Sequence, residues 1–246
     1  MADAAMVLLD TEDRGTVDNA HLSAVLLERG LAASGASRLV RLHRPERTVA
    51  FSRLESHLPG FPAAVTAAAC RGFTPIVRPT GGRAVSYDRS SWILDVIEPS
   101  SRQPTDNRSA FAGVAHAIAE ALRRCGVDAA VGQVEGEYCP GRYSVHARGI
   151  VKLAGVAQRL TPTKRLTSAL IVLGDPTASR EALEDVNAEL GFEWDPTTYG
   201  AASEERPGIT DSDLSDAVIS AMCRAEYAVV PVHRLCSELF APGAGA

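Results

Sequence analysis

The spacing of hydrophobic and polar positions predicts that helices and strands alternate in the first half of the chain and that strands dominate its middle. Residues 16–33 carry leucine and valine at helical spacing, whereas the short apolar runs between turn residues are typical of strands. On these criteria we expect helices over 16–33, 63–71, 106–124, 179–190 and 211–227, and strands over 7–9, 39–42, 48–51, 74–78, 91–97, 129–134, 143–146, 150–153, 156–160 and 166–172.

The connections complete the expected fold. Arg148-Gly149 has the chemistry of a tight hairpin turn, and residues 193–208, rich in Pro, Gly and acidic residues, are expected to form a surface loop. Residues 241–246 should be a frayed tail. Since no repeat or strong linker divides the chain, we expect residues 1–246 to form a single α+β domain in which helices cover a mixed or antiparallel sheet.

Composition narrows the class of protein. Hydrophobic residues make up 46% and charged residues 22%, as in globular proteins with a core. A membrane-spanning helix needs about 18 consecutive apolar residues, and no run in the chain approaches that length. The start of the chain has no secretory pattern, which predicts a cytoplasmic protein. The net charge of -5 argues against a nucleic-acid partner. Five cysteines without a CxxC pair and scattered histidines predict free thiols and no metal site.

The segment Arg78–Asp88, RPTGGRAVSYD, is the first unusual stretch. Its adjacent glycines, Gly81 and Gly82, allow a ligand to approach the backbone closely, and backbone N–H groups in such a turn can bind an anion. The segment is neither a dinucleotide-binding GxGxxG loop nor a GxxxxGK[ST] phosphate loop. An ordinary glycine turn is the alternative interpretation.

A second stretch, residues 135–159, contains a cysteine and a lysine in unusual settings. Cys139 precedes Pro-Gly, which favours an exposed turn, and Lys152 interrupts an apolar run. Lys152 either snorkels from an edge strand or projects into a cleft. The predicted hairpin turn at 148–149 brings it back towards Cys139, where an ammonium group would lower the pKa of the thiol and favour the nucleophilic thiolate. His146 is a rival base, although a surface histidine is the simpler interpretation. The other four cysteines are expected to be small buried hydrophobes: Cys70, Cys125, Cys223 and Cys236.

Together, RPTGGRAVSYD and GIVKLAGVAQR (residues 149–159) resemble the lipoate–protein ligase and octanoyltransferase family, also called the biotin/lipoate A/B protein ligase family. The resemblance extends over most of the chain and implies the catalytic-domain fold of that family. It implies that Lys152 is the functional lysine. The residues it places around the acyl group are Arg78, Thr80, Gly81, Gly82, Arg83, Ala84, Val85, Ala154, Gly155 and Val156.

The family contains two chemistries, and Cys139 favours one of them. The chain looks most like the cysteine-dependent octanoyltransferases, in which a cysteine about a dozen residues before the lysine accepts the acyl group as a thioester. That resemblance implies Cys139 as nucleophile and no required cofactor. Arg83 replaces the third glycine of the common motif and Tyr87-Asp88 replaces its His-Asp, departures that weaken the ligase interpretation.

Three functions follow from the resemblance. The first is transfer of an octanoyl or lipoyl group from an acyl carrier protein or an acylated lipoyl domain, through Cys139, to the lysine of an acceptor lipoyl domain. The second is an ATP- and Mg-dependent lipoate–protein ligase that forms an acyl-adenylate, and the third a non-catalytic relative that binds octanoate or lipoate. An arginine patch near the site would attract acidic partners: Arg142, Arg148, Arg159 and Arg165.

Overall fold

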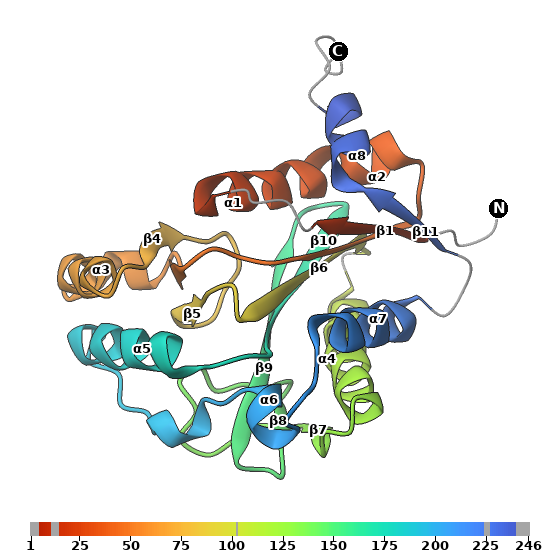
Figure 1. Cartoon of the computed structure of the whole chain (residues 1–246). Coiled ribbons are helices and arrows are strands. Elements are labelled where there is room, and N and C mark those ends of the chain that lie inside the picture. Colours follow the sequence, from red (N-terminus) through yellow and green to blue (C-terminus); the bar gives the residue numbers. More distant parts are fainter. Residues whose placement is uncertain (1–4, 11–14, 102, 224–226, 240–246) are drawn as a thin grey trace.

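Two β-sheets form the framework of the protein (Figure 1). The computed structural model describes residues 5–10, 15–101, 103–223 and 227–239, together with the side chains in these ranges except those of residues 237 and 238. The strands within them are β1 (Ala5–Asp10), β2 (Arg38–His43), β3 (Thr48–Phe51), β4 (Thr74–Val77), β5 (Val85–Tyr87), β6 (Ser91–Pro99), β7 (Ala129–Val131), β8 (Val145–Ala147), β9 (Val151–Leu160), β10 (Lys164–Val172) and β11 (Tyr227–Pro231).

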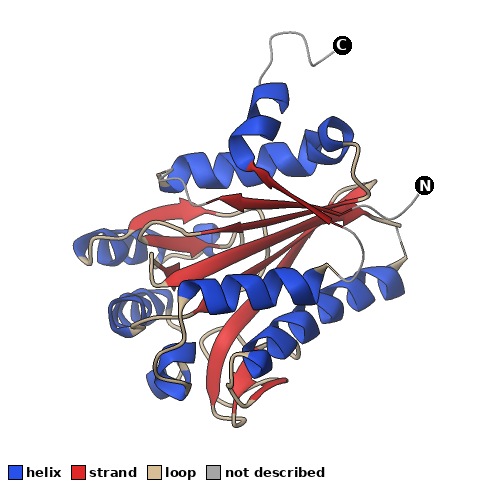
Figure 2. Cartoon of the chain, turned by 45° about the vertical axis from the view of Figure 1, so that its right-hand side comes forward, coloured by secondary structure: helices blue, strands red, loops and turns tan. Residues whose placement is uncertain are grey.

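Helices cover both faces of the larger sheet, as Figures 1 and 2 show. Short 3₁₀ or π turns are labelled η. The helical elements of the described residues are α1 (Thr16–Val25), η1 (Leu26–Gly30), α2 (Leu31–Ser34), η2 (Glu55–His57), α3 (Phe61–Cys70), α4 (Pro104–Arg124), α5 (Thr177–Leu190), η3 (Pro196–Thr198), α6 (Ala202–Glu205), α7 (Asp211–Met222) and α8 (Val232–Leu239).

The larger sheet has the strand order β11-β1-β2-β6-β10-β9-β8-β7, and the smaller sheet has the order β4-β3-β5. β1 pairs in parallel with β2 and β11, while β6, β10 and β9 pair antiparallel. In Figure 2, α4 and α7 lie on one side of the strands and α1, α2 and α8 on the other. The expected α+β fold with a mixed sheet covered by helices is confirmed.

One face of the larger sheet is apolar. Leu42, Leu94, Ala169 and Val156 are aligned across four neighbouring strands and belong to the core beneath α4 and α7. Because successive side chains of a strand point to opposite faces, the residues on either side of this row face the other way. That second face is covered by α1 and by the smaller sheet with α3 and α5, and it holds the polar groups described below.

Four expectations about secondary structure need correction. Residues 150–153 and 156–160 are not separate strands: they belong to β9, which pairs with β10 through its small residues. The helix expected over 211–227 ends at Met222, and Tyr227 begins β11. The surface loop expected over 193–208 contains η3 and α6 and buries Tyr199 against Tyr138. The pattern also gave no indication of β5 or α8.

Two points remain, on the C-terminal tail and on membrane-spanning helices. The tail at 241–246 lies outside the described residues. Within the ranges that are described, no helix combines the length and the apolar character needed to cross a membrane.

Candidate active site

A cavity of about 510 Å³ lies on the polar face of the larger sheet. Its floor includes a row of residues aligned across β2, β6, β10 and β9: His43, Ile93, Leu170 and Gly155. The walls come from α1, from the segment between β4 and β5, and from the segment before β8. The cavity therefore joins segments that lie far apart in the sequence.

Cys139 meets the glycine turn at one end of this cavity. The Arg83 backbone N–H donates a hydrogen bond to Cys139 Sγ at 3.2 Å. Gly82 has a φ of 99°, and a Cβ atom at that position would lie 3.2 Å from Sγ. Glycine at position 82 therefore provides both the backbone conformation and the space that the thiol occupies.

Lys152 projects into the same end of the cavity and does not snorkel to solvent. Its side chain is 3% exposed, and Nζ donates to the Cys139 carbonyl oxygen at 2.7 Å. Nζ also forms an ion pair with Glu137 Oε2 at 2.8 Å and lies 4.5 Å from the centre of the Tyr138 ring. Nζ thus contacts the backbone of Cys139, and the thiol–ammonium pair expected from the sequence is not among the hydrogen bonds of the described residues.

A β-bulge turns Lys152 towards the cavity. The pairing of β8 with β9 passes from His146↔Lys152 to Val145↔Ala154, so Leu153 is an extra residue in β9. A bulge places two successive residues on one side, and Leu153 and Ala154 both belong to the core beneath α4 and α7. Lys152 and Gly155 consequently share the cavity face, and a Cβ at position 155 would lie 3.3 Å from Lys152 Cε.

Glu137 organises the segment that carries Cys139. Its buried carboxylate accepts hydrogen bonds from Ser144 Oγ at 2.7 Å and from the Gly141 N–H at 3.0 Å, besides the Lys152 ion pair. It also accepts the Val134 N–H at 3.3 Å. One carboxylate thereby ties both ends of the segment to Lys152. The sequence does not single out Glu137, because Glu135 stands two residues earlier and is also a glutamate, yet is exposed in the structure.

The glycine turn is fixed by two other side chains. Glu55, which is buried, accepts the Ala84 N–H at 2.7 Å through Oε1 and the Ser52 N–H at 2.7 Å through Oε2. Arg78 Nη2 donates to the Arg83 carbonyl oxygen at 2.7 Å. Glu55 gave no motif signal in the sequence, since its partners are backbone groups that only the fold brings to it.

Most of the residues expected at the site line the cavity, and three do not. Arg83 contributes its backbone N–H, while its guanidinium lies 4.4 Å from the centre of the Phe192 ring. Ala84 is fully buried, and Ala154 faces the opposite side of the sheet because of the bulge. The expected residues that do line the cavity are Arg78, Thr80, Gly81, Gly82, Val85, Cys139, Lys152, Gly155 and Val156.

The structure also bears on three further interpretations of the sequence: His146 as a base, the arginine patch and the buried thiols. His146 does not line the cavity, and its Nδ1 accepts the Gly149 N–H at the hairpin turn. The arginine patch is partly neutralised, because Arg148 pairs with Glu205, and Arg165 pairs with Glu98 and Asp106. The expectation of a buried thiol holds for Cys223 and is wrong for Cys70, which is exposed, while Cys125 and Cys236 are only half-buried.

The far end of the cavity is polar. Asp95 accepts a hydrogen bond from Ser23 Oγ at 2.6 Å and lies 4.0 Å from Arg41 Nη1. Burial, and secondarily the charge of Arg41, hold the pKa of His43 well below its ordinary value, so the ring is neutral at physiological pH. Burial raises the pKa of Tyr87 to about 12, which keeps the phenol protonated.

This arrangement suits nucleophilic acyl chemistry. The thiol of Cys139 lies against a backbone N–H that can donate to a developing negative charge, and the buried Lys152 ammonium donates to the carbonyl oxygen of the same cysteine. Ile93, Leu170 and Val85 give the space between the thiol and the polar end an apolar lining suited to a hydrocarbon chain.

Comparison with curated proteins points to one group of enzymes. No protein-family model matches the chain. Over 192 residues, 78% of this chain and 65% of the relative, it is 25% identical to the octanoyl-[GcvH]:protein N-octanoyltransferase of Geobacillus kaustophilus. Over 158 residues, 64% of this chain and 56% of the relative, it is 26% identical to the lipoyl-[GcvH]:protein N-lipoyltransferase of Listeria monocytogenes. The matches thus span less than two thirds of the length of these relatives.

Solved structures share the fold. A lipoate-protein ligase A bound with ATP matches with a TM-score of 0.69 at 19% identity, covering 99% of this chain and 96% of its own. A lipoate protein ligase from T. acidophilum with bound lipoic acid matches with a TM-score of 0.68 at 17% identity, covering 97% and 94%. Together with the curated relatives, these matches confirm the family resemblance that the two motifs indicate.

Proposed function

We propose that this chain, which belongs with the lipoate–protein ligases and octanoyltransferases, is an acyltransferase that moves an octanoyl or lipoyl group through Cys139 to the lysine of a lipoyl domain. One observation carries the proposal: the two motif segments meet at Cys139 Sγ, inside the cavity that also holds Lys152.

In the first half-reaction, the Cys139 thiolate attacks the carbonyl carbon of the donor's acyl group. A C–S bond forms, the bond from that carbon to the donor's lysine nitrogen or carrier sulfur breaks, and the departing atom takes up a proton. The Arg83 N–H donates to Sγ at 3.2 Å and is therefore positioned to stabilise negative charge at the reacting centre.

In the second half-reaction, the amine of the acceptor lysine attacks the thioester carbon. The new C–N bond forms as the C–S bond breaks, and the amine proton leaves while the thiolate of Cys139 is regenerated. We assign the proton exchange to Lys152, which Glu137 holds in place beside the Cys139 carbonyl. Because the acyl group starts and ends as a thioester or an amide, no ATP is consumed.

The partners follow from the chemistry of the relatives. The names of the two curated relatives specify an acyl group carried by [GcvH] as the donor. One solved structure with the same fold is described as a lipoate protein ligase with its E2 lipoyl domain. We therefore propose an acylated lipoyl domain as donor, with an acyl carrier protein as the other donor class, and a lipoyl domain as acceptor.

The proposal is tested by an ATP-free transfer assay. An octanoylated lipoyl-domain protein and an octanoylated acyl carrier protein are each mixed with an unmodified acceptor domain and the wild-type chain. Acceptor mass is followed with time. We expect transfer from at least one donor without ATP. Acceptor modification only with free lipoate or octanoate, ATP and Mg would identify a ligase, and octanoate binding without any transfer would identify a binding protein.

A further inference from the structure

The cavity extends from Cys139 across four strands to a polar end. His43, Ile93, Leu170 and Gly155 are aligned in register, so His43 and Gly155 stand three strand spacings apart, about 14 Å at about 4.8 Å per strand. An extended eight-carbon acyl chain spans about 9 Å, given C–C bonds of about 1.5 Å. His43 lines the same cavity, so a chain attached to Sγ that follows this row points its last carbons towards the polar end.

Three cavity-lining side chains define that end, which we call the distal subsite: His43, Tyr87 and Asp95. His43 is 5% exposed, and its Nδ1 has no hydrogen-bond partner among the described residues. Tyr87 lies on β5, which pairs with β3, the strand that follows β2 in the chain. The charge of Asp95 raises the pKa of the Tyr87 phenol and that of Arg78 lowers it. The distal subsite thus offers acceptors at His43 and Asp95 and a hydroxyl at Tyr87.

The charges behind the distal subsite are already paired. Arg41 is fully buried and donates to Asp10 Oδ2 at 2.8 Å and to Ser23 Oγ at 3.1 Å. Its guanidinium is therefore occupied by protein groups, and a ligand meets the neutral His43 and Tyr87 together with the Asp95 carboxylate. A negatively charged ligand group would be repelled by Asp95, whereas a neutral hydrogen-bond donor fits.

We propose that the distal subsite binds a neutral polar group, a hydroxyl or thiol, at the far end of an acyl chain of about eight carbons, so that the protein prefers such chains to plain octanoyl groups. The proposal rests on the proposed function for the orientation of the chain, with its carbonyl at Cys139. A terminal methyl would leave His43 Nδ1 facing hydrocarbon without a partner, which is unfavourable for a buried polar atom, whereas Asp95 keeps its hydrogen bond from Ser23. A terminal carboxylate would place a second negative charge beside Asp95.

Binding of free acids tests the subsite without requiring transfer. Octanoate, 8-hydroxyoctanoate and octanedioate are titrated into Cys139→Ala and wild-type protein by calorimetry. We expect 8-hydroxyoctanoate to bind about tenfold more tightly than octanoate, and octanedioate to bind most weakly. Equal or tighter binding of octanoate would overturn the proposal.

Two substitutions locate the preference. His43→Phe and Tyr87→Phe each keep an aromatic ring and remove the polar atom, so each should reduce the tenfold preference severalfold, while His57→Phe, at an exposed position, should keep it. An unchanged preference in both folded variants would place the selectivity elsewhere and overturn the assignment. If either variant fails to fold, the wild-type titration still decides.

A transfer assay separates this proposal from the proposed function. The same acyl groups are attached to the donor lipoyl domain, and kcat/KM is measured. We expect the 8-hydroxyoctanoyl donor to exceed the octanoyl donor by about the same factor as in binding. Transfer without selectivity would contradict the distal subsite alone. Selective binding with no transfer of any acyl group would support the subsite and contradict the acyltransferase.

Discussion

The two faces of the larger sheet differ in their side chains, although alternate residues of the same strands supply them: one face packs as an apolar core, whereas the other places polar groups among apolar ones around the cavity. Leu42, Leu94 and Ala169 pack beneath α4 and α7. Their sequence neighbours Asp95 and Ser168 face the cavity, where Asp95 contacts Ser23 of α1. One face therefore provides apolar burial, and the other holds polar groups whose burial depends on partners.

Mutations on the two faces should therefore affect different properties, stability on one and transfer on the other. Substitutions on the apolar face should change stability and leave the rate of transfer per folded molecule intact. Substitutions around Cys139 should change transfer, and they should change stability only where a buried charge or a strained glycine is involved.

The largest effect is expected at Cys139. Cys139→Ala removes the nucleophile and should lower the transfer rate on the order of 10³-fold or more. Because the side chain is only partly buried, the free energy of unfolding should change by less than about 1 kcal/mol. The matched control is Cys70→Ala, at an exposed position outside the cavity, which should transfer at the wild-type rate. Transfer by Cys139→Ala at a rate near wild type would contradict the assignment.

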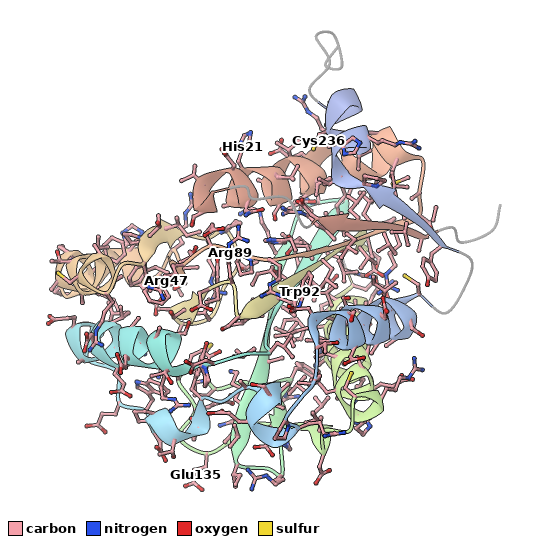
Figure 3. All side chains as sticks on the ribbon, in the orientation of Figure 1. His21, Arg47, Arg89, Trp92, Glu135 and Cys236 are labelled. Atoms are coloured by element: carbon pink, nitrogen blue, oxygen red, sulfur yellow. The ribbon has the colours of Figure 1, made fainter. Side chains whose placement is uncertain are left out.

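The second effect concerns the buried ion pair. Glu137→Gln leaves the Lys152 ammonium buried without its carboxylate and should lower the free energy of unfolding by about 3–5 kcal/mol. Denaturant unfolding measures this change, and transfer should also fall because the Cys139 segment loosens. Glu135→Gln is the control, since Glu135 lies at the outer edge of the molecule (Figure 3) and is exposed. Equal stability of the two variants would show that Glu137 does not organise the segment.

The apolar face should respond in stability alone. Leu94→Ala creates a cavity in the core and should destabilise the fold by about 2–5 kcal/mol, measured by denaturant unfolding. Leu54→Ala, at a side chain 82% exposed, should change stability by less than about 0.5 kcal/mol. If Leu94→Ala lowered transfer per folded molecule as strongly as it lowered stability, the division between the faces would be wrong.

A smaller effect is expected in the glycine turn. Gly82→Ala places a side chain at a φ of 99° and a Cβ 3.2 Å from Cys139 Sγ, so it should destabilise the fold by about 1–3 kcal/mol and lower transfer. The control is Gly81→Ala, where an added Cβ meets nothing within 4 Å. Thermal unfolding and initial rates of both variants check the difference. Similar behaviour of the two would mean that the contact with the thiol does not matter.

The smallest effect is a pH dependence. The pKa of His43 is held well below 6.5 by burial and by Arg41, so below pH 6.5 the unfolded chain binds a proton that the folded chain does not. Stability should therefore decline as the pH falls through 6.5, by up to about 1.4 kcal/mol per pH unit from this group. His43→Phe should show a shallower decline than wild type or His57→Phe between pH 6.5 and 5. Parallel curves for all three proteins would contradict a neutral buried His43.

Much of the fold was predictable because its strands and longer helices carry strong local patterns. β2, β6 and β10 and helices α1, α4 and α5 lie where hydrophobic periodicity places them. β9 was divided wrongly because Ala154 and Gly155 weaken the apolar run, and its continuity depends on pairing with β10. β11 depends on β1 in the same way, since its side chains are largely exposed.

The site was predictable only as far as its motifs extend. Cys139 and Lys152 lie in one cavity as the hairpin turn suggests, but the bulge that redirects Ala154 depends on cross-strand register. Glu137 and Glu55 act through backbone N–H groups and, for Glu137, a buried lysine, and no residue pattern in the chain marks those partners. The polar distal subsite likewise arises where strands distant in sequence are aligned.

Intact mass shows directly whether Cys139 carries the acyl group. Wild type and Cys139→Ala are each mixed with an octanoylated donor protein, without ATP and without acceptor, and their masses are recorded before and after hydroxylamine. We expect one octanoyl adduct on the wild type, removed by hydroxylamine and missing from Cys139→Ala, because a thioester forms at the thiol. A wild-type protein that transfers octanoate to an acceptor yet never carries such an adduct, or a Cys139→Ala variant that does, would contradict this expectation.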